Sequence, residues 1–203
     1  LVDESAPVRE VAAEICEKLN LLKPYEEWSL TLGSTRAFLD PVVGLQEQGV
    51  TEQTKVWLKK KHFWTDDKID KSSPLNLSLM YHQARFGITH GEHHVTEDEA
   101  VAFAALQLQI ENGRFDEKKH KPATVFKEID NWFEEKYQKK TKLQKQAMEE
   151  WKAFGGMTQL DAMYQYMKLA RGLATYGVVM FAVGIVVPGK KEKQPELIGV
   201  AKN

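Results

Sequence analysis

The hydrophobic period of this 203-residue chain changes twice, and this change limits the fold more than any other feature. Apolar residues recur at helical spacing from Ser72 for about a hundred residues. Short alternating segments, which are typical of strands, stand on both sides of that region. A helical module between two strand-containing pieces indicates an α+β chain with more than one lobe.

Two helix starts in the central region carry clear local signals. Ser73 is expected at an N-cap, followed by Pro74 at the first helical position. Thr96 and Glu99 form a capping box with acids in the first turn, and the apolar run behind them ends at Gly113. We therefore predict a helix from Pro74 onward and a second one between Thr96 and Gly113.

Three further helices are expected before the central region ends. Residues 124–136 place valine, isoleucine and aromatic side chains on one side of a helix. A capping box that starts at Thr141 predicts another helix, with Gly155 as its stop. Thr158 is expected to cap the last long helix, which runs to Leu173.

The first piece of the chain combines one helix with short strands. Ser5 is expected to cap a helix whose apolar residues recur from Val8 to Leu19. After that helix the sequence changes to short alternating segments. Strands are expected at 28–32, 37–40 and 56–64.

The last piece begins with an apolar run at 178–187 that is rich in β-branched residues. Its length is about half of the ~20 residues that a membrane-spanning helix needs, so we predict a buried strand. A turn-like stretch and a second apolar segment at 197–201 follow. Together they predict the opening hairpin of a third module.

Composition excludes several classes of protein. With 42% hydrophobic and 28% charged residues the chain has the composition of a soluble globular protein. The single cysteine, Cys16, rules out an internal disulfide, suits a reducing compartment and is expected to be a small buried hydrophobe. The first residues lack the features of a signal peptide and start without methionine, so we expect a fragment of a longer cytoplasmic protein.

Residues 136–145, KYQKKTKLQK, hold five lysines and no acid, although the formal net charge of the chain is only −1. They lie at the expected start of the helix at Thr141, where the helix dipole and free N–H groups are already positive. Cations there oppose the dipole, whereas phosphate or another anion would be attracted. The candidate lysines are Lys136, Lys139, Lys140, Lys142 and Lys145.

Two interpretations of these lysines remain open. Charge runs usually form a solvated face, and salt screening keeps their mutual repulsion small. Alternatively, they join other basic groups at 118–121 and at Lys190, Lys191 and Lys193 in a footprint for an acidic membrane. Nucleic acid is the weaker partner class, because the run lacks interleaved aromatic residues and the chain is not basic overall.

The sequence supports no catalytic, metal or cofactor site. Residues 184–190 match most of a phosphate-binding loop, but Lys191 replaces the required Ser or Thr and no helix is expected to follow. His90, His93 and His94 lie in the short link before a helix start, with no distant partner ligand, so we expect a solvated loop rather than a metal site. An enzyme is therefore the weaker class.

Several stretches resemble the FERM heads of the talin family. The passage YMKLARGLATYGVVMF at 166–181 is similar to the FERM signature between the second and third lobes. Stretches that resemble talins more specifically stand at 45–50, 69–85, 97–121 and 197–203.

The resemblance implies a multi-lobe FERM-like α+β fold in three parts. Residues 1–64 would be a ubiquitin-like first lobe without its N-terminal strand. Residues 65–174 would be the helical second lobe, a bundle like that of acyl-coenzyme-A-binding proteins. Residues 175–203 would be the first strands of a third lobe of the PH/PTB type.

The resemblance also implies a function without catalysis. Talin heads are cytoskeletal adaptors that join adhesion-receptor tails of the integrin type and acidic phosphoinositides, such as phosphatidylinositol bisphosphate, to actin at the inner face of the plasma membrane. The family's second lobe carries a basic membrane-orienting patch whose first lysine closes a KHK motif, which stands here as Lys119-His120-Lys121. Its other lysines correspond approximately to Lys139, Lys140 and Lys142, and the family's lysine-rich hairpin corresponds to Lys190, Lys191 and Lys193.

Two alternatives remain. The first is a FERM cargo-binding module from a myosin tail. The second is a small-ligand or acyl-coenzyme-A-binding protein, because the helical second lobe resembles such bundles.

Overall fold

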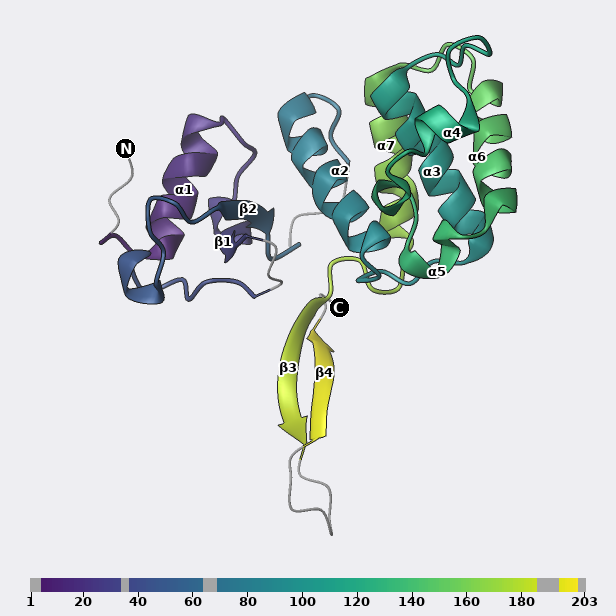
Figure 1. Cartoon of the computed structure of the whole chain (residues 1–203). Helices are drawn as coiled ribbons and strands as arrows, with labels where there is room; N and C mark the ends of the chain where they lie inside the picture. The colour runs from purple at the N-terminus through teal and green to yellow at the C-terminus, as the bar shows by residue number, and fades with distance from the viewer. Residues whose placement is uncertain (1–4, 34–36, 64–68, 186–193, 201–203) are drawn as a thin grey trace. The chain divides into compact units, whose positions relative to one another are not determined.

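A computed structural model describes residues 5–33, 37–63, 69–185 and 194–200. The chain divides into two compact units (Figure 1). One, here called the mixed unit, comprises Leu1–Asp67 and Gly177–Asn203. The other, here called the helical unit, comprises Lys68–Tyr176.

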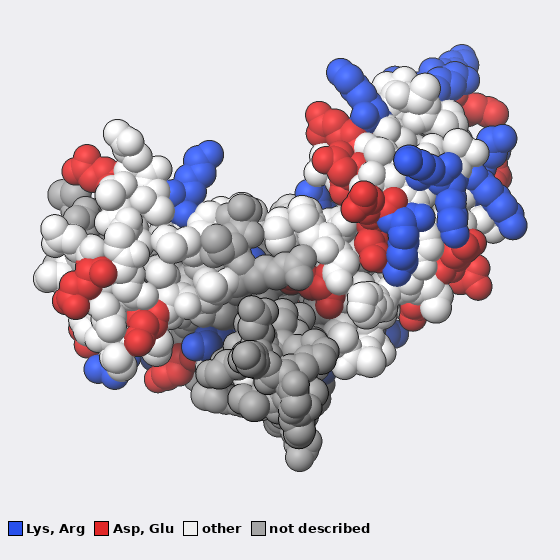
Figure 2. Space-filling model, turned by 60° about the horizontal axis from the view of Figure 1, so that its bottom comes forward, with Lys and Arg blue, Asp and Glu red and all other residues white. Residues whose placement is uncertain are grey.

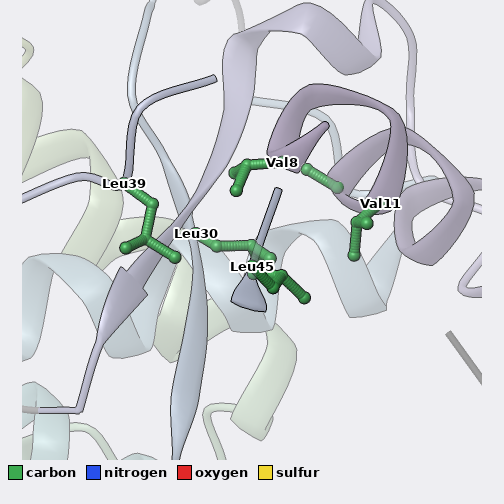
Figure 3. Packing of buried hydrophobic residues seen from close by; sticks show 6 residues of the cluster. Val8, Val11, Leu30, Leu39 and Leu45 are labelled. Carbon is green, nitrogen blue, oxygen red and sulfur yellow. The ribbon is translucent and has the colours of Figure 1, made fainter. Parts of the chain in front are cut away.

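The mixed unit packs helix α1 (Val8–Lys18) against a two-stranded antiparallel sheet. Strand β1 (Trp28–Leu32) follows the 3₁₀ turn η1 (Tyr25–Glu27) and pairs with β2 (Val56–Lys60), which comes after the 3₁₀ turn η2 (Gln46–Gln48). Apolar residues from α1, β1 and the β1–β2 connection meet in one core. The helical period of α1 turns its apolar residues toward the sheet. Figure 3 shows its members Val8, Val11, Leu30, Leu39 and Leu45.

The start of α1 differs from the expectation. Pro7, not Ser5, holds the N-cap position. The amides of Val8 and Arg9 donate to the carbonyl oxygens of Val43 and Pro41 at 3.1 and 3.0 Å. Since these backbone oxygens satisfy N–H groups at the start of the helix, a serine cap is not needed there.

Two of the expected strands in this unit are also corrected. Residues 37–40 form only a bridge between Phe38 and Thr31, followed by a hydrogen bond from the Leu39 amide to Leu30 O, while the Leu39 side chain enters the core. Strand β2 ends at Lys60 rather than at 64, because the next two amides both donate to the Glu27 carbonyl instead of continuing the ladder.

The two strands expected at the C-terminal end are present, and the second begins three residues earlier than predicted. Strand β3 (Val179–Ile185) pairs with β4 (Gln194–Val200) in an antiparallel hairpin. The register runs from Val179 opposite Val200 to Ile185 opposite Gln194. The turn between them, with Lys190, Lys191 and Lys193, lies outside the described residues.

The helical unit is built around α3 (Glu97–Asn112). It packs against α6 (Thr141–Ala153) and α7 (Gln159–Arg171), and α7 in turn packs against α2 (Pro74–Thr89). Most of α3 from Ala100 to Ile110 is buried. The bundle of Figure 1 therefore encloses α3, and the four expected long helices are confirmed.

The single helix expected at 124–136 is wrong. The structure has three separate turns there: α4 (Pro122–Val125), the 3₁₀ turn η3 (Ile129–Asn131) and α5 (Glu135–Gln138). The Asn131 carbonyl accepts from Gln107 Nε2 of α3 at 2.8 Å. This tertiary bond and the burial of aromatic side chains on both sides of η3 outweigh the local helical period.

Of the four caps expected in the helical unit, two are confirmed and one is wrong, while Ser73 holds the N-cap position of α2 without a side-chain hydrogen bond that caps the helix. Thr96 accepts from the Glu99 amide in a capping box, and Thr158 accepts from the Asp161 amide at 3.1 Å. Thr141, however, is the first residue of α6, and Lys140 holds the N-cap position. Helices α5 and α6 follow each other so closely that the Thr141 amide donates to Lys139 O, which leaves no extended residue for a threonine cap.

Within the described ranges, none of the helices has the length and apolar character needed to cross a bilayer.

Candidate functional site

Helices α5 and α6 carry the lysine run. Lys136 lies in α5, Lys139 and Lys140 form the junction, and Lys142 and Lys145 lie in the first turns of α6. Their helical spacing turns them outward, because Leu143, Ala147 and Trp151 occupy the buried side of α6. Figure 2 shows Lys and Arg side chains gathered on one face of the helical unit, with acidic side chains along its border.

Tyr137 anchors this run to the bundle. The residue is 7% exposed, and its hydroxyl donates to the carbonyl of Val95, just before α3, at 2.7 Å. The ammonium groups of Lys136 and Lys140 lie 4.8 and 5.2 Å from the centre of its ring. Cation–π attraction to one buried tyrosine therefore helps to position these two lysines.

The same two lysines have acidic partners. Lys136 Nζ lies 2.8 Å from Glu134 Oε2, and this ion pair raises the pKa of Lys136. Lys140 Nζ lies 2.5 Å from Glu97 Oε1 in the first turn of α3, and the hydrogen bond lowers the pKa of Glu97. Part of the repulsion expected at the start of α6 is therefore neutralised within the protein.

The other lysines of the run are exposed and form no ion pair within 4.0 Å in the described part of the chain. They are Lys139, Lys142 and Lys145. A surface hollow of about 510 Å³ lies along the exposed side of α6. It is lined by Thr141, Lys142, Lys145, Gln146, Glu149 and Glu150.

The hollow has two different ends. Lysines line it near the start of α6, and Glu149 and Glu150 line it one to two turns further on. Partial burial raises the pKa of Glu150, and the nearby charge of Asp98 raises it further. An anion would therefore be attracted to the lysine end and repelled from the glutamate end.

Lys121 lies near the other end of α6. It is exposed at the N-cap position of α4, which packs against α6. The preceding His120 ring lies 4.6 Å from the Trp151 ring, and its Nδ1 accepts from the Asp116 amide at 3.0 Å. The loop with the KHK motif is thus fixed to the C-terminal half of α6, whose 13 residues span roughly 20 Å.

Three residues of this surface were not identified from the sequence: Glu97, Glu134 and Tyr137. Glu97 appeared only as a favourable first-turn acid, and no local pattern links it to Lys140, 43 residues away. The spacing of Phe133 and Tyr137, four residues apart, was the available signal for a buried tyrosine inside the lysine run.

Of the three histidines at 90–94, His90 and His94 are exposed, whereas His93 is less solvated than expected. His93 is half-buried, its Nδ1 lies 2.9 Å from Thr175 Oγ1, and its ring occupies the space that a side chain at Gly87 would need. This close approach explains why residue 87 of α2 is a glycine. His90 stacks on Phe86 at 3.9 Å between ring centres. A search of the described residues found no group of three or more His, Cys, Asp or Glu side chains placed to hold a metal.

Comparison with known protein families matches residues 66–181, more than half of the chain, to the FERM central domain. This chain belongs to the FERM family. Among curated relatives of this FERM chain, Talin-A of Dictyostelium discoideum is 35% identical over 202 residues, which cover 100% of this chain and 8% of that protein. Talin-1 of Gallus gallus is 38% identical over 165 residues, which cover 81% of this chain and 6% of the relative. The talin-like FERM assignment from the sequence is confirmed, and the chain spans less than a tenth of these two relatives.

The FERM-like fold is confirmed by solved structures. The MyTH4-FERM MF1 domain of Dictyostelium discoideum myosin VII superposes with a TM-score of 0.70, and the match covers 98% of this FERM chain and 43% of that one. The FERM domain of Drosophila Merlin, solved in complex with its C-terminal domain, gives a TM-score of 0.69 over 99% of this chain and 68% of that one. At 12% and 15% sequence identity these likenesses show the fold alone.

Proposed function

We propose that this chain is part of a cytoskeletal adaptor of the talin type, without catalytic activity, which docks on acidic phosphoinositides through its helical unit. The supporting observations are the talin relatives and the exposed lysines around α6. In this proposal residues 1–64 belong to the ubiquitin-like first lobe, 65–174 form the second lobe, and 175–203 begin the third.

One observation carries the proposal. Lys139, Lys142 and Lys145 are exposed at the start of α6, without the ion pairs that neutralise Lys136 and Lys140. The N–H groups at a helix start add positive potential at the same place. Near an anionic leaflet each lysine contributes about 1 kcal/mol, so three lysines give roughly a hundred-fold gain in affinity that salt weakens.

Lys121 extends this surface along α6, and we propose the hairpin lysines Lys190, Lys191 and Lys193 as a third contact with the membrane. The full-length protein would then lie in the cytoplasm at the inner face of the plasma membrane. It would connect adhesion-receptor tails there to the actin cytoskeleton. Receptor binding would also require the rest of the third lobe.

The test is sedimentation with phosphatidylcholine vesicles that contain phosphatidylinositol bisphosphate, at low and physiological salt. Wild type is compared with a variant in which Lys139, Lys142 and Lys145 are all changed to Glu. The matched control changes Arg9, Lys23 and Lys55 to Glu. These residues are exposed in the mixed unit, and the substitutions alter the net charge by the same amount.

We expect salt-sensitive binding by the wild type and the control, and loss of binding by the α6 variant. Circular dichroism establishes that all three proteins are folded. Equal losses of vesicle binding in both variants would show that net charge alone controls binding. Equal binding by all three proteins would leave the lysines as a solvated face and refute the proposal.

A further inference from the structure

The starts of α3 and α6 meet at a single ion pair, Lys140 with Glu97. The two charged atoms lie 2.5 Å apart, and the side chains are 45% and 50% exposed. Lys142 adds a weaker electrostatic attraction on the same carboxylate. The Glu97 carboxylate is therefore already paired with the ammonium group of Lys140, the residue directly before the part of α6 that lines the hollow.

An exposed pair of this kind is weakly held, because water and salt screen the attraction. The phosphates of a phosphoinositide carry more negative charge and more acceptor oxygens than a carboxylate. A headgroup at the lysine end of the hollow would lie beside Thr141 and Lys142 and away from Glu149 and Glu150. Lys140 directly precedes Thr141 in the chain. The headgroup would thus compete with Glu97 for Lys140.

We propose that Glu97 is an internal counterion for Lys140, which an acidic lipid headgroup must displace before Lys140 takes part in binding. This inference rests on the proposed membrane function of the same surface. Within the lysine run, Lys139, Lys142 and Lys145 are available at once, whereas Lys140 becomes available only after its ion pair with Glu97 breaks. Lys136 is paired separately with Glu134.

The decisive variant is Glu97→Gln, and Asp98→Asn is its matched control. Both substitutions remove one negative charge from the first turn of α3 and leave the capping box of Thr96 and Glu99 intact. Asp98 interacts with Glu150 instead of pairing with Lys140. The comparison therefore isolates the release of Lys140 from the change in net charge.

The 203-residue chain is titrated with phosphatidylcholine vesicles that contain phosphatidylinositol bisphosphate. We expect Glu97→Gln to bind about two- to five-fold more tightly than wild type, because it removes the cost of breaking an exposed ion pair, which is at most about the contribution of one lysine. Asp98→Asn should gain less than about two-fold, because screening weakens a charge that touches no lipid-binding lysine. Equal gains for the two variants would overturn the inference.

Lys140→Gln gives a second, independent measurement. In the wild-type background it should weaken binding less than Lys142→Gln does. In the Glu97→Gln background the two substitutions should weaken binding equally. If Lys140→Gln and Lys142→Gln have equal effects in both backgrounds, Lys140 already contacts lipid and Glu97 does not restrain it.

The outcomes separate this inference from the proposed function. If the wild type does not bind vesicles, the membrane function fails and the role of Glu97 fails with it. If wild type binds and the triple Glu variant does not, but Glu97→Gln has no gain, only the inference fails. A further experiment titrates the chain with soluble inositol trisphosphate. If Glu97→Gln raises the affinity for this soluble headgroup as much as the affinity for vesicles, the phosphate that displaces Glu97 need not come from a membrane, and that part of the inference is refuted.

Discussion

Reversing the charge of Lys142 should stabilise the helical unit and weaken its binding to acidic vesicles. Lys142 is the second residue of α6, where a cation opposes the helix dipole and an anion favours it. Removing the cation and adding the anion each contribute about 0.3–1 kcal/mol to the free energy of unfolding. The low end of this range applies because the side chain is exposed. Loss of the attraction between Lys142 and Glu97 offsets part of this gain.

The expected net increase in the free energy of unfolding for Lys142→Glu is about 0.5 kcal/mol. For a unit of about a hundred residues this raises the melting temperature by roughly 2–4 °C. Affinity for vesicles should fall at least five-fold, since one lysine is lost and one repulsive charge is added. Thermal melts and vesicle sedimentation on the same preparation measure both quantities.

Lys152→Glu is the matched control, because Lys152 lies in the last turn of the same helix, where the dipole favours a cation. We expect its melting temperature to fall. A lower melting temperature for Lys142→Glu, or unchanged vesicle affinity, would refute the reasoning. Opposite signs for stability and binding cannot arise from misfolding, which would lower both.

Three further predictions concern the stability of the helical unit. Burial lowers the pKa of His93, so as the pH falls below about 6.5 the unfolded chain takes up a proton before the folded chain does. The free energy of unfolding should therefore be full above that pH and decrease below it. His93→Gln should reduce the difference in melting temperature between about pH 7.5 and pH 5.5, whereas His94→Gln at the exposed neighbour should not. Thr96→Ala removes the capping box and should cost about 1 kcal/mol in urea unfolding, and no change would contradict the role of the cap. Trp151→Ala should lower the free energy of unfolding by about 3–5 kcal/mol, because the side chain is fully buried and its Nε1 donates to two acceptors. A decrease of less than about 1 kcal/mol would show that the site repacks.

Features that depend on neighbouring residues were predictable from the sequence. The caps at Thr96 and Thr158 involve amides only three residues away, so the pattern contains all the participants. Strand β1 and helices α6 and α7 follow from hydrophobic periods of two and 3.6 residues. Helix α3 is buried on nearly all sides, and its signals were the capping box and the glycine stop. The FERM-like fold itself was expected from the resemblance to talin heads, not from these periods.

Features that depend on distant residues were not predictable in this way. Residues 124–136 have a helical pattern, but Gln107 of α3 binds the Asn131 carbonyl and breaks the expected helix. Thr141 fits a capping box, yet the turn of α5 directly before it fills the space that a cap requires. Local propensity is a weak guide wherever tertiary contacts compete with it.

The lysine surface shows the same division. Its position at the start of α6 was evident from the sequence, because charge and helix start coincide there. The sequence did not reveal which lysines are neutralised, since Glu97 lies on another helix, 43 residues from Lys140. Lys121 could be placed by resemblance, but the packing of His120 on Trp151 that fixes its loop required the structure.

The division of residues 122–138 into single turns has a consequence for hydrogen exchange. These turns contain few helical bonds of their own and depend on a few bonds to the body of the unit, such as those from Gln107 to Asn131 and from Tyr137 to Val95. Opening them disrupts less structure than opening α3, so their amides should exchange at a lower free energy than those of the long helices. Lys136 belongs to this easily opened part, and it can therefore adjust to a surface while the bundle stays folded.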